Sequence, residues 1–280
     1  MSTVTEERPA TPSEPGLDRS DLPPPVRGRA LWVVFGSLLL LGSLWWGAFS
    51  VVDLIAHEER TERFTVPAEQ LTRLLVDNDI GSVTITGTDT EVISVEAAIS
   101  DGLRDTGFRH EVVDSTLEVH GSCPALGGMW CRVRLSIEVP RGLDVAVNAD
   151  NDRVDVSNLD GSVVIDSDNG AVELVDVSGP IEVAGNNGRI VGTELSSTRV
   201  DVATDNGRIE LLFTDPPDVV IASGDNGSID IVVPQVEGGY HVTVDTDNGD
   251  DDLTAVTNNS DSPRTITAET DNGDVTVASP

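Results

Sequence analysis

Apolar and polar residues alternate along most of the chain after about residue 70, and an Asn, usually followed by Gly, interrupts the alternation at regular intervals. Alternation with a period of two places the apolar side chains on one face of a strand. Each repeat is therefore predicted to be a strand, an Asn-Gly turn and a second strand. The anchor asparagines are spaced by 18, 18, 19, 20, 22 and 24 residues, and they are Asn151, Asn169, Asn187, Asn206, Asn226, Asn248 and Asn272.

The apolar positions recur at fixed offsets from each anchor, six and four residues before it and three and five after it, and only Gly192 and Asp251 interrupt the flanking columns. Parallel stacking of such repeats would bury continuous columns of Val and Ile and align the asparagines in a ladder. We therefore predict an all-β fold, a parallel β-solenoid of about seven two-strand repeats over residues 141–280. A meander of antiparallel hairpins is the alternative, because Asn-Gly is also a common hairpin turn.

Residues 71–140 hold an early, less regular copy of the motif at Asp77-Asn78. This region is predicted to be an irregular N-terminal β cap, because the open end of a stack presents unpaired backbone groups that would recruit another chain. Within it, two strands are expected at residues 116–120 and 133–139.

Residues 30–52 are 23 consecutive uncharged positions and predict one transmembrane helix before the β-region. Arg27 and Arg29 precede the segment, so the positive-inside rule predicts a single-pass protein of the cell membrane, with its N-terminus cytoplasmic and its C-terminal domain extracellular. A cleavable signal peptide is the alternative. The proline-rich residues 1–29 are expected to be a disordered cytoplasmic tail, and residues 53–70 a linker.

The chain has two cysteines, Cys123 and Cys131, in the loop between the two strands expected in the cap. An extracellular location would expose them to an oxidising environment, so a disulfide between them is predicted. A redox switch or a metal pair is the alternative, although metal sites normally bring further Cys or His ligands nearby.

The chain carries 49 acidic and 17 basic residues, a net charge of -32. Such a surface repels nucleic acid, which is excluded as a partner. Acidic residues also recur just before the anchors, and at a strand spacing of about 4.8 Å neighbouring carboxylates repel by roughly 0.9 kcal/mol even at the dielectric of water. Calcium would offset this repulsion, and no other cofactor is expected; alternatively, each Asp accepts a hydrogen bond from a turn amide. The calcium candidates are Asp168, Asp205, Asp225, Asp247 and Asp271.

Several strings of the repeats resemble a known family. They include Gly161-Ser162-Val163 leading to Asp168-Asn169-Gly170, then Asp205-Asn206-Gly207, Asp225-Asn226-Gly227 and Asp271-Asn272-Gly273. Over about residues 70–280 the chain resembles the bacterial putative-adhesin family of β-strand repeats, a domain of unknown function. The resemblance implies a membrane-tethered or secreted β-solenoid without established catalytic residues. Asp79 and Asp152 depart from the family pattern, because Gly is expected at both turn positions.

These observations predict a membrane-anchored extracellular β-domain that acts as a non-catalytic adhesion or binding scaffold. Its partner would be an extracellular protein or an envelope component. That partner is expected at the edge where the connections between repeats lengthen, at residues 216–217, 234–240 and 258–263. The first alternative is a cell-envelope sensing or accessory signalling protein.

A carbohydrate-active enzyme is a further, less favoured alternative. Its acids and bases would come from Asp166, Asp168, Arg189 and Arg208, placed together on one face. Sugar-binding sites usually also offer aromatic stacking surfaces, and the region after residue 53 has few aromatic residues.

Overall fold

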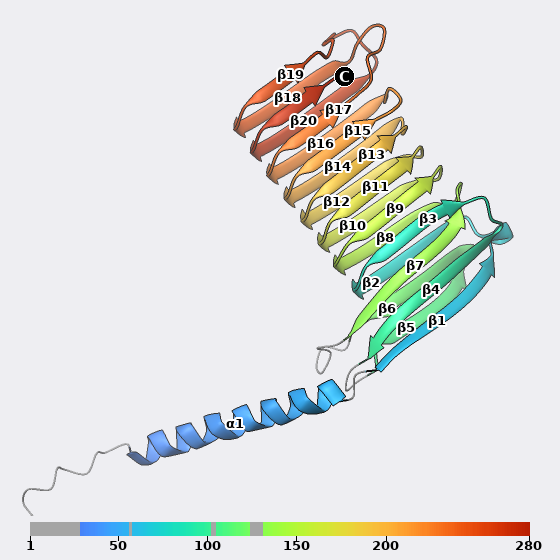
Figure 1. The fold of residues 1–280 in the computed structure, drawn as a ribbon. Helices are drawn as coiled ribbons and strands as arrows, with labels where there is room; N and C mark the ends of the chain where they lie inside the picture. The colour runs from blue at the N-terminus through green and yellow to red at the C-terminus, as the bar shows by residue number, and fades with distance from the viewer. Residues whose placement is uncertain (1–28, 56–57, 102–104, 124–130) are drawn as a thin grey trace, which may run out of the picture. The chain divides into compact units, whose positions relative to one another are not determined.

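The computed structural model describes residues 29–55, 58–101, 105–123 and 131–280, and the predicted tail 1–28 lies outside them. The chain divides into two units, residues 1–50 and 51–280. Within the described residues, α1 (Arg29–Ile55) is followed by β-strands and one short 3₁₀ turn, so the all-β part of the predicted fold class is confirmed (Figure 1).

Among the residues that the structure describes, no helix is both long and apolar enough to cross a membrane. The predicted transmembrane segment at residues 30–52 is therefore wrong, and so is the single-pass membrane location derived from it.

The strands of the second unit form two sheets, named here sheet A and sheet B. Sheet A contains β1 (Glu58–Pro67), β3 (Val83–Thr88), β4 (Val92–Asp101), β7 (Arg132–Pro140), β9 (Val154–Leu159), β11 (Val172–Val177), β13 (Ile190–Leu195), β15 (Ile209–Phe213), β17 (Ile229–Val232), β19 (Asp251–Thr254) and β21 (Val275–Ala278). Sheet B contains β2 (Arg73–Ile80), β5 (Gly107–Val113), β6 (Thr116–Ser122), β8 (Asp144–Asn151), β10 (Val163–Asn169), β12 (Ile181–Asn187), β14 (Arg199–Asn206), β16 (Val219–Asn226), β18 (His241–Asn248) and β20 (Thr265–Asn272). Each repeat thus gives one strand to each sheet.

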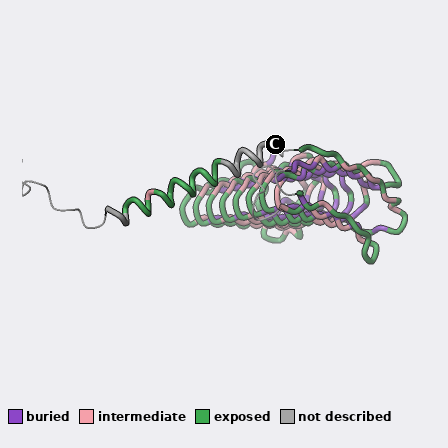
Figure 2. The backbone as a smooth tube through the Cα atoms, turned by 90° about the horizontal axis from the view of Figure 1, so that it is seen from below, coloured by how far each residue is buried: buried purple, intermediate pink, exposed green. Residues whose placement is uncertain are grey.

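From β8 onward, neighbouring strands in both sheets pair parallel, with equivalent positions of the repeats side by side. Val163 lies between Val145 and Ile181, and Asn169 is paired with Asn151. Most residues of the apolar columns are buried in one hydrophobic core. Figure 2 marks the buried residues along the backbone. Parallel pairing excludes the antiparallel hairpin meander for these strands.

The last two repeats do not stack in chain order. In sheet B the order is β16, β20, β18, and in sheet A it is β17, β21, β19. The final repeat, β20 and β21, therefore lies between the fifth repeat and the sixth. The sixth repeat becomes the end of the stack, and all four residues of β19 are exposed. This position explains how Asp251 can interrupt an apolar column, because its strand has a neighbour on one side only.

The stacking order also explains why the last connections are long. The connection from β17 to β18 skips the position next to the fifth repeat, and the connection from β19 to β20 leads back to that position. These connections do not fan outward as free loops. They are hydrogen-bonded to one another through Asn259 Nδ2 to Gly238 O at 2.8 Å and Ser262 Oγ to Gly239 O at 2.7 Å, and Tyr240 is only 1% exposed.

Six of the seven anchors are followed by glycine, which permits a close approach between neighbouring repeats. A Cβ atom at Gly188 would lie 1.7 Å from the carbonyl oxygen of Gly170, and one at Gly207 would lie 1.8 Å from that of Gly188. Contacts this short are sterically impossible, so a side chain would push neighbouring repeats apart. Asp152, one of the two departures from the motif, adopts nearly the same φ as Gly188, 159° against 158°.

The N-terminal part of the unit is less regular. The two expected strands are present as β6 and β7, which pair parallel with β2 and β3, whereas β4 and β1 extend sheet A antiparallel and β5 extends sheet B antiparallel. The stretch expected to be a linker contains β1 and a 3₁₀ turn (Ala68–Gln70), because Phe64 and Val66 pack against the core. Asn78 does not join the anchor column, since its partner in β8 is Ala149.

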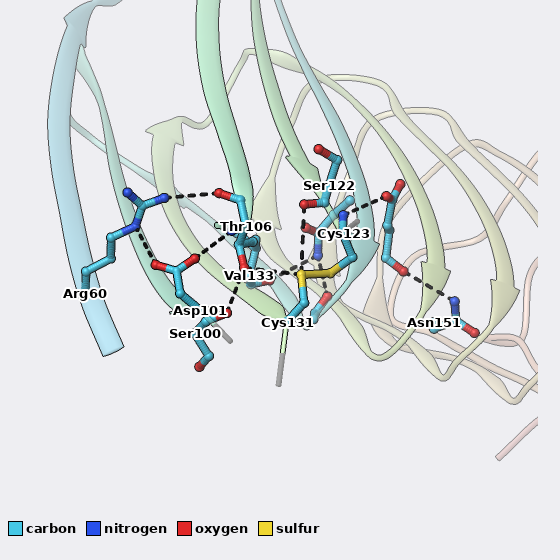
Figure 3. Close-up of a disulfide and its surroundings, with 12 residues drawn as sticks. Arg60, Ser100, Asp101, Thr106, Ser122, Cys123, Cys131, Val133 and Asn151 are labelled. Carbon is cyan, nitrogen blue, oxygen red and sulfur yellow. Dashed lines mark hydrogen bonds and ion pairs between the residues drawn. A yellow bond between two sulfur atoms is a disulfide. The ribbon is translucent and has the colours of Figure 1, made fainter. Parts of the chain in front are cut away.

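The predicted disulfide between Cys123 and Cys131 is present, with a Cα–Cα distance of 5.8 Å (Figure 3). The Cys123 amide donates to Asp79 Oδ2 at 3.0 Å, and Thr106 Oγ1 lies 3.3 Å from Cys131 Sγ. Thr106 is also held by Asp101, whose Oδ1 accepts its amide hydrogen at 2.7 Å. The disulfide therefore joins the residue after β6 to the residue before β7, and the hydrogen bonds of Thr106 link Cys131 to Asp101 at the end of β4.

Candidate functional site

The anchor asparagines form a ladder at the end of sheet B. Asn206 Nδ2 donates to Asn187 Oδ1 at 3.1 Å, and Asn206 Oδ1 accepts from Asn226 Nδ2 at 3.1 Å. Equivalent bonds continue through the other anchors in the order of stacking, over Asn272 to Asn248. The predicted ladder is confirmed, and it fixes the backbone that carries the acidic residue in front of each anchor.

A groove of about 270 Å³ lies on the outer side of β14, β16, β20 and β18. It is hollow because residues with small side chains or none, among them Ala203, Ser223 and Gly224, contribute to its lining. The remaining lining residues are Thr204, Thr270 and six acidic residues, Asp205, Asp225, Asp245, Asp247, Glu269 and Asp271. A concave surface with carboxylates and no basic residue in its lining focuses a negative potential, which favours cationic ligands.

Four of the five calcium candidates line this groove, namely Asp205, Asp225, Asp247 and Asp271. The fifth, Asp168, lies outside it on β10, where its Oδ1 accepts a hydrogen bond from Asn186 Nδ2 at 2.6 Å. Carboxylate oxygens are the ligands that calcium prefers, so the column has the right donor chemistry for that ion.

The alternative role of these aspartates, as acceptors of turn amides, has no support among the described residues. Within the column, Asp168 accepts from the side chain of Asn186, and the amides of the turn glycines bond to main-chain oxygens of the neighbouring repeat. For example, the Gly188 amide donates to Asn206 O at 2.9 Å. The Asp250 amide donates to a carboxylate, Asp274 Oδ1 at 3.0 Å, but Asp274 lies outside the column. Hydrogen bonds from turn amides therefore do not offset the repulsion between the carboxylates.

Electrostatic repulsion is visible in the pKa of Asp150, at the other end of the same column. Partial desolvation has the largest effect, and the negative charges of Asp79, Asp168 and Asp77 add to it; together they raise the pKa of Asp150 above its usual value. Charged neighbours of the same sign disfavour ionisation.

A second cluster lies on the outer face of β5 and β6. Carboxylate oxygens of Glu111 and Glu118 and a ring nitrogen of His120 all lie within 4.8 Å of one another. Asp77 Oδ2 lies 3.2 Å from His120 Nδ1 on the neighbouring strand β2. This group has the donor types of a metal site, and the sequence pattern did not reveal it. The spacing Glu118-x-His120 on one strand face was the available signal, but Glu111 joins only through the pairing of β5 with β6.

The residues of the enzyme hypothesis are divided between the two sheets. Asp166 and Asp168 lie on β10 of sheet B, whereas Arg189 and Arg208 directly precede β13 and β15 of sheet A. Among the described residues, Arg208 forms an ion pair with Glu210, at 3.5 Å. The structure therefore does not join these four side chains through any ion pair.

No family model matches the chain, and no curated protein matches it. Solved structures to which the chain is similar include a putative cell adhesion protein from Clostridium sporogenes, with 13% identity, a TM-score of 0.41, and coverage of 80% of this chain and 100% of that chain. A putative adhesin from Parabacteroides merdae has 11% identity and a TM-score of 0.29, with coverage of 80% and 96%. A putative lipid binding protein from Parabacteroides distasonis has 8% identity and a TM-score of 0.27, with coverage of 79% and 97%.

These neighbours include proteins described as adhesins, the class that the sequence motifs resemble.

Proposed function

We propose that the chain is a non-catalytic binding scaffold, in which the two sheets form a β-solenoid that holds the acidic groove in a fixed shape for a cationic partner. The observation that supports this function is the groove itself, with six acidic side chains around a floor of small residues. The asparagine ladder and the parallel pairing keep the groove formed before any ligand arrives, which lowers the entropy lost on binding.

The partner class follows from the chemistry of the groove. A peptide segment with Arg or Lys would place its charged groups among the carboxylates, while its backbone approaches Ser223 and Gly224, where no large side chain intervenes. An adhesion function, or an accessory role in sensing, would use the same surface. We propose such a basic segment of another protein as the natural ligand.

Calorimetric titration of the full chain with a blocked peptide of alternating Arg and Gly tests the proposal. The double variant Asp205→Asn and Asp225→Asn should weaken binding at least about tenfold, since two charge-assisted contacts of about 1 kcal/mol or more are lost. The matched control is Asp89→Asn with Glu138→Gln, which removes the same charge from exposed positions outside the groove and should leave the affinity within about twofold. Equal losses in both double variants would reduce the interaction to general charge attraction and overturn the proposal.

Calcium is the second candidate ligand, because no basic residue in the groove lining neutralises the carboxylates there. These carboxylates include Asp205, Asp225, Asp271 and Asp247. Thermal unfolding with calcium and with chelator measures this separately. A rise in melting temperature with calcium that disappears in the Asp205→Asn and Asp225→Asn variant would assign the groove to the metal. Unchanged melting temperatures would remove calcium and leave the peptide as the ligand to pursue.

A further inference from the structure

One edge of sheet B lacks the features that keep sheet edges from pairing. The strand β5 ends the sheet, its strand pairing is with β6 alone, and six of its seven residues are exposed. Val112 and Val113 are large apolar residues with exposed fractions of 54% and 41%. Exposed apolar residues on an unpaired edge strand are a template for pairing with another chain.

The three other edge strands carry charges that oppose such pairing. On β1 the charged residues include Glu58, Glu62 and Arg63, and β18 and β19 at the other end of the stack are rich in aspartate. Charged side chains along an edge are a common way to prevent association between sheets. The edge of β5 carries two charged residues of opposite sign, Arg109 and Glu111, whereas the charged residues of β18 and β19 are all aspartates and β1 carries five charged residues.

The sequence of β5 is complementary to itself in the antiparallel direction. If two copies pair about His110, then Arg109 of each copy lies opposite Glu111 of the other, and Phe108 lies opposite Val112. Directly opposite residues in an antiparallel pair project on the same face of the sheet. The ion pair and the apolar pair would therefore each form twice, as a twofold axis requires.

The apolar pairs of the proposed dimer would lie on the inner face of sheet B and the ion pairs on its outer face. In the pairing with β6, Val112 lies opposite the buried Leu117, so Phe108 and Val112 belong to the inner face. Arg109 lies opposite His120, so Arg109 and Glu111 belong to the outer face. Apolar contacts would extend the core, and the ion pairs would lie at the surface.

The charged residues of β5 and β6 within a single copy also favour pairing with a second copy. Glu111 lies directly opposite Glu118 on β6, a like-charged pair that destabilises a sheet. Arg109 forms no ion pair with any described residue. Arg109 of a second copy would supply the positive charge that Glu111 lacks.

We propose that β5 is a dimerisation edge, through which two copies of this chain pair antiparallel about His110 and join their B sheets into one continuous sheet. The occupant of the edge is a second copy, because the order of charges and apolar residues matches its own reverse.

Sedimentation velocity of the full chain, from low to high micromolar concentration, tests the proposal. The wild type should form a dimer, and the variants Arg109→Glu and Glu111→Arg, each alone, should weaken dimerisation at least about tenfold, because each converts two attractive pairs into two repulsive ones.

An equimolar mixture of the two variants should recover the dimer. In the mixed dimer the introduced glutamate of one copy faces the introduced arginine of the other, and the unchanged Glu111 faces the unchanged Arg109, so both pairs are attractive again. Recovery on mixing also shows that both variants are folded.

The control variants are Arg134→Glu and Glu138→Arg, which make the same charge changes at exposed positions of the interior strand β7. They should dimerise like the wild type. A wild type that stays monomeric at high micromolar concentration, single variants that dimerise unchanged, or a mixture that fails to recover the dimer would each overturn the proposal.

Discussion

Replacing Asn206 by alanine removes two neighbouring rungs of the asparagine ladder at once. Asn206 donates to Asn187 and accepts from Asn226, both at 3.1 Å. At the end of the stack Asn248 makes one amide–amide bond of this kind, to Asn272 at 3.2 Å, and a longer bond to the main-chain oxygen of Asp271, at 3.4 Å. The same substitution at the two sites therefore deletes two ladder bonds in one case and one in the other.

The expected magnitudes follow from the exposure of these side chains. A typical hydrogen bond contributes about 0.5 to 1.5 kcal/mol net, and exposed amides regain bonds to water, so the lower half of that range applies. Asn206→Ala should then cost about 1 to 2 kcal/mol of unfolding free energy and Asn248→Ala about half as much. For a domain of this size, the melting temperature should fall by roughly 2 to 8 °C and roughly 1 to 4 °C respectively.

Thermal unfolding followed by circular dichroism measures both variants under identical conditions. A third variant, Asn206→Asp, keeps the shape but cannot donate, and it adds a charge beside Asp205. It should destabilise more than alanine at neutral pH and recover as the new carboxyl is protonated below about pH 4. If Asn206→Ala lowers the melting temperature no more than Asn248→Ala, the ladder does not stabilise the stack through these bonds.

Three further predictions concern stability. The pKa of Asp150 is raised in the folded chain, so this residue favours the folded state below its unfolded pKa, and that contribution to stability is lost as pH rises through the folded pKa. The variant Asp150→Asn should therefore raise the melting temperature at pH 7 and give no gain near pH 3. A lower melting temperature at pH 7 would contradict this prediction. Gly192→Ala should lower the free energy of unfolding by about 1 to 3 kcal/mol, because the new methyl group would lie 2.7 Å from Leu195 Cδ1. An unchanged denaturation midpoint would show that the Leu195 side chain can move aside without loss of stability. Reduction of the disulfide, or Cys123→Ser with Cys131→Ser, should lower the free energy of unfolding by about 2 to 3 kcal/mol, because the unfolded chain gains conformational freedom without the crosslink. Identical melting curves with and without reductant would refute that value.

The repeating pattern of single residues was enough to predict most of the architecture. Inward positions such as Val163 and Ile165, and anchors such as Asn169, recur at fixed offsets, and a period of two leaves little choice of face. The same regularity aligns Asp205 and Asp225 in one column of the sequence. The disulfide was predictable because the chain has two cysteines and both lie in one short loop.

The order of stacking, the groove and the cluster at His120 were decided by tertiary structure. Every repeat presents nearly the same apolar face, so the local pattern cannot say whether the last repeat stacks outside or inside the sixth. The groove exists because strands from four repeats place the small residues around Gly224 side by side. Glu111 reaches His120 only through the pairing of β5 with β6. Periodicity in a sequence specifies which face of each strand is buried, whereas the choice of neighbour depends on contacts between distant segments, which only the folded chain contains.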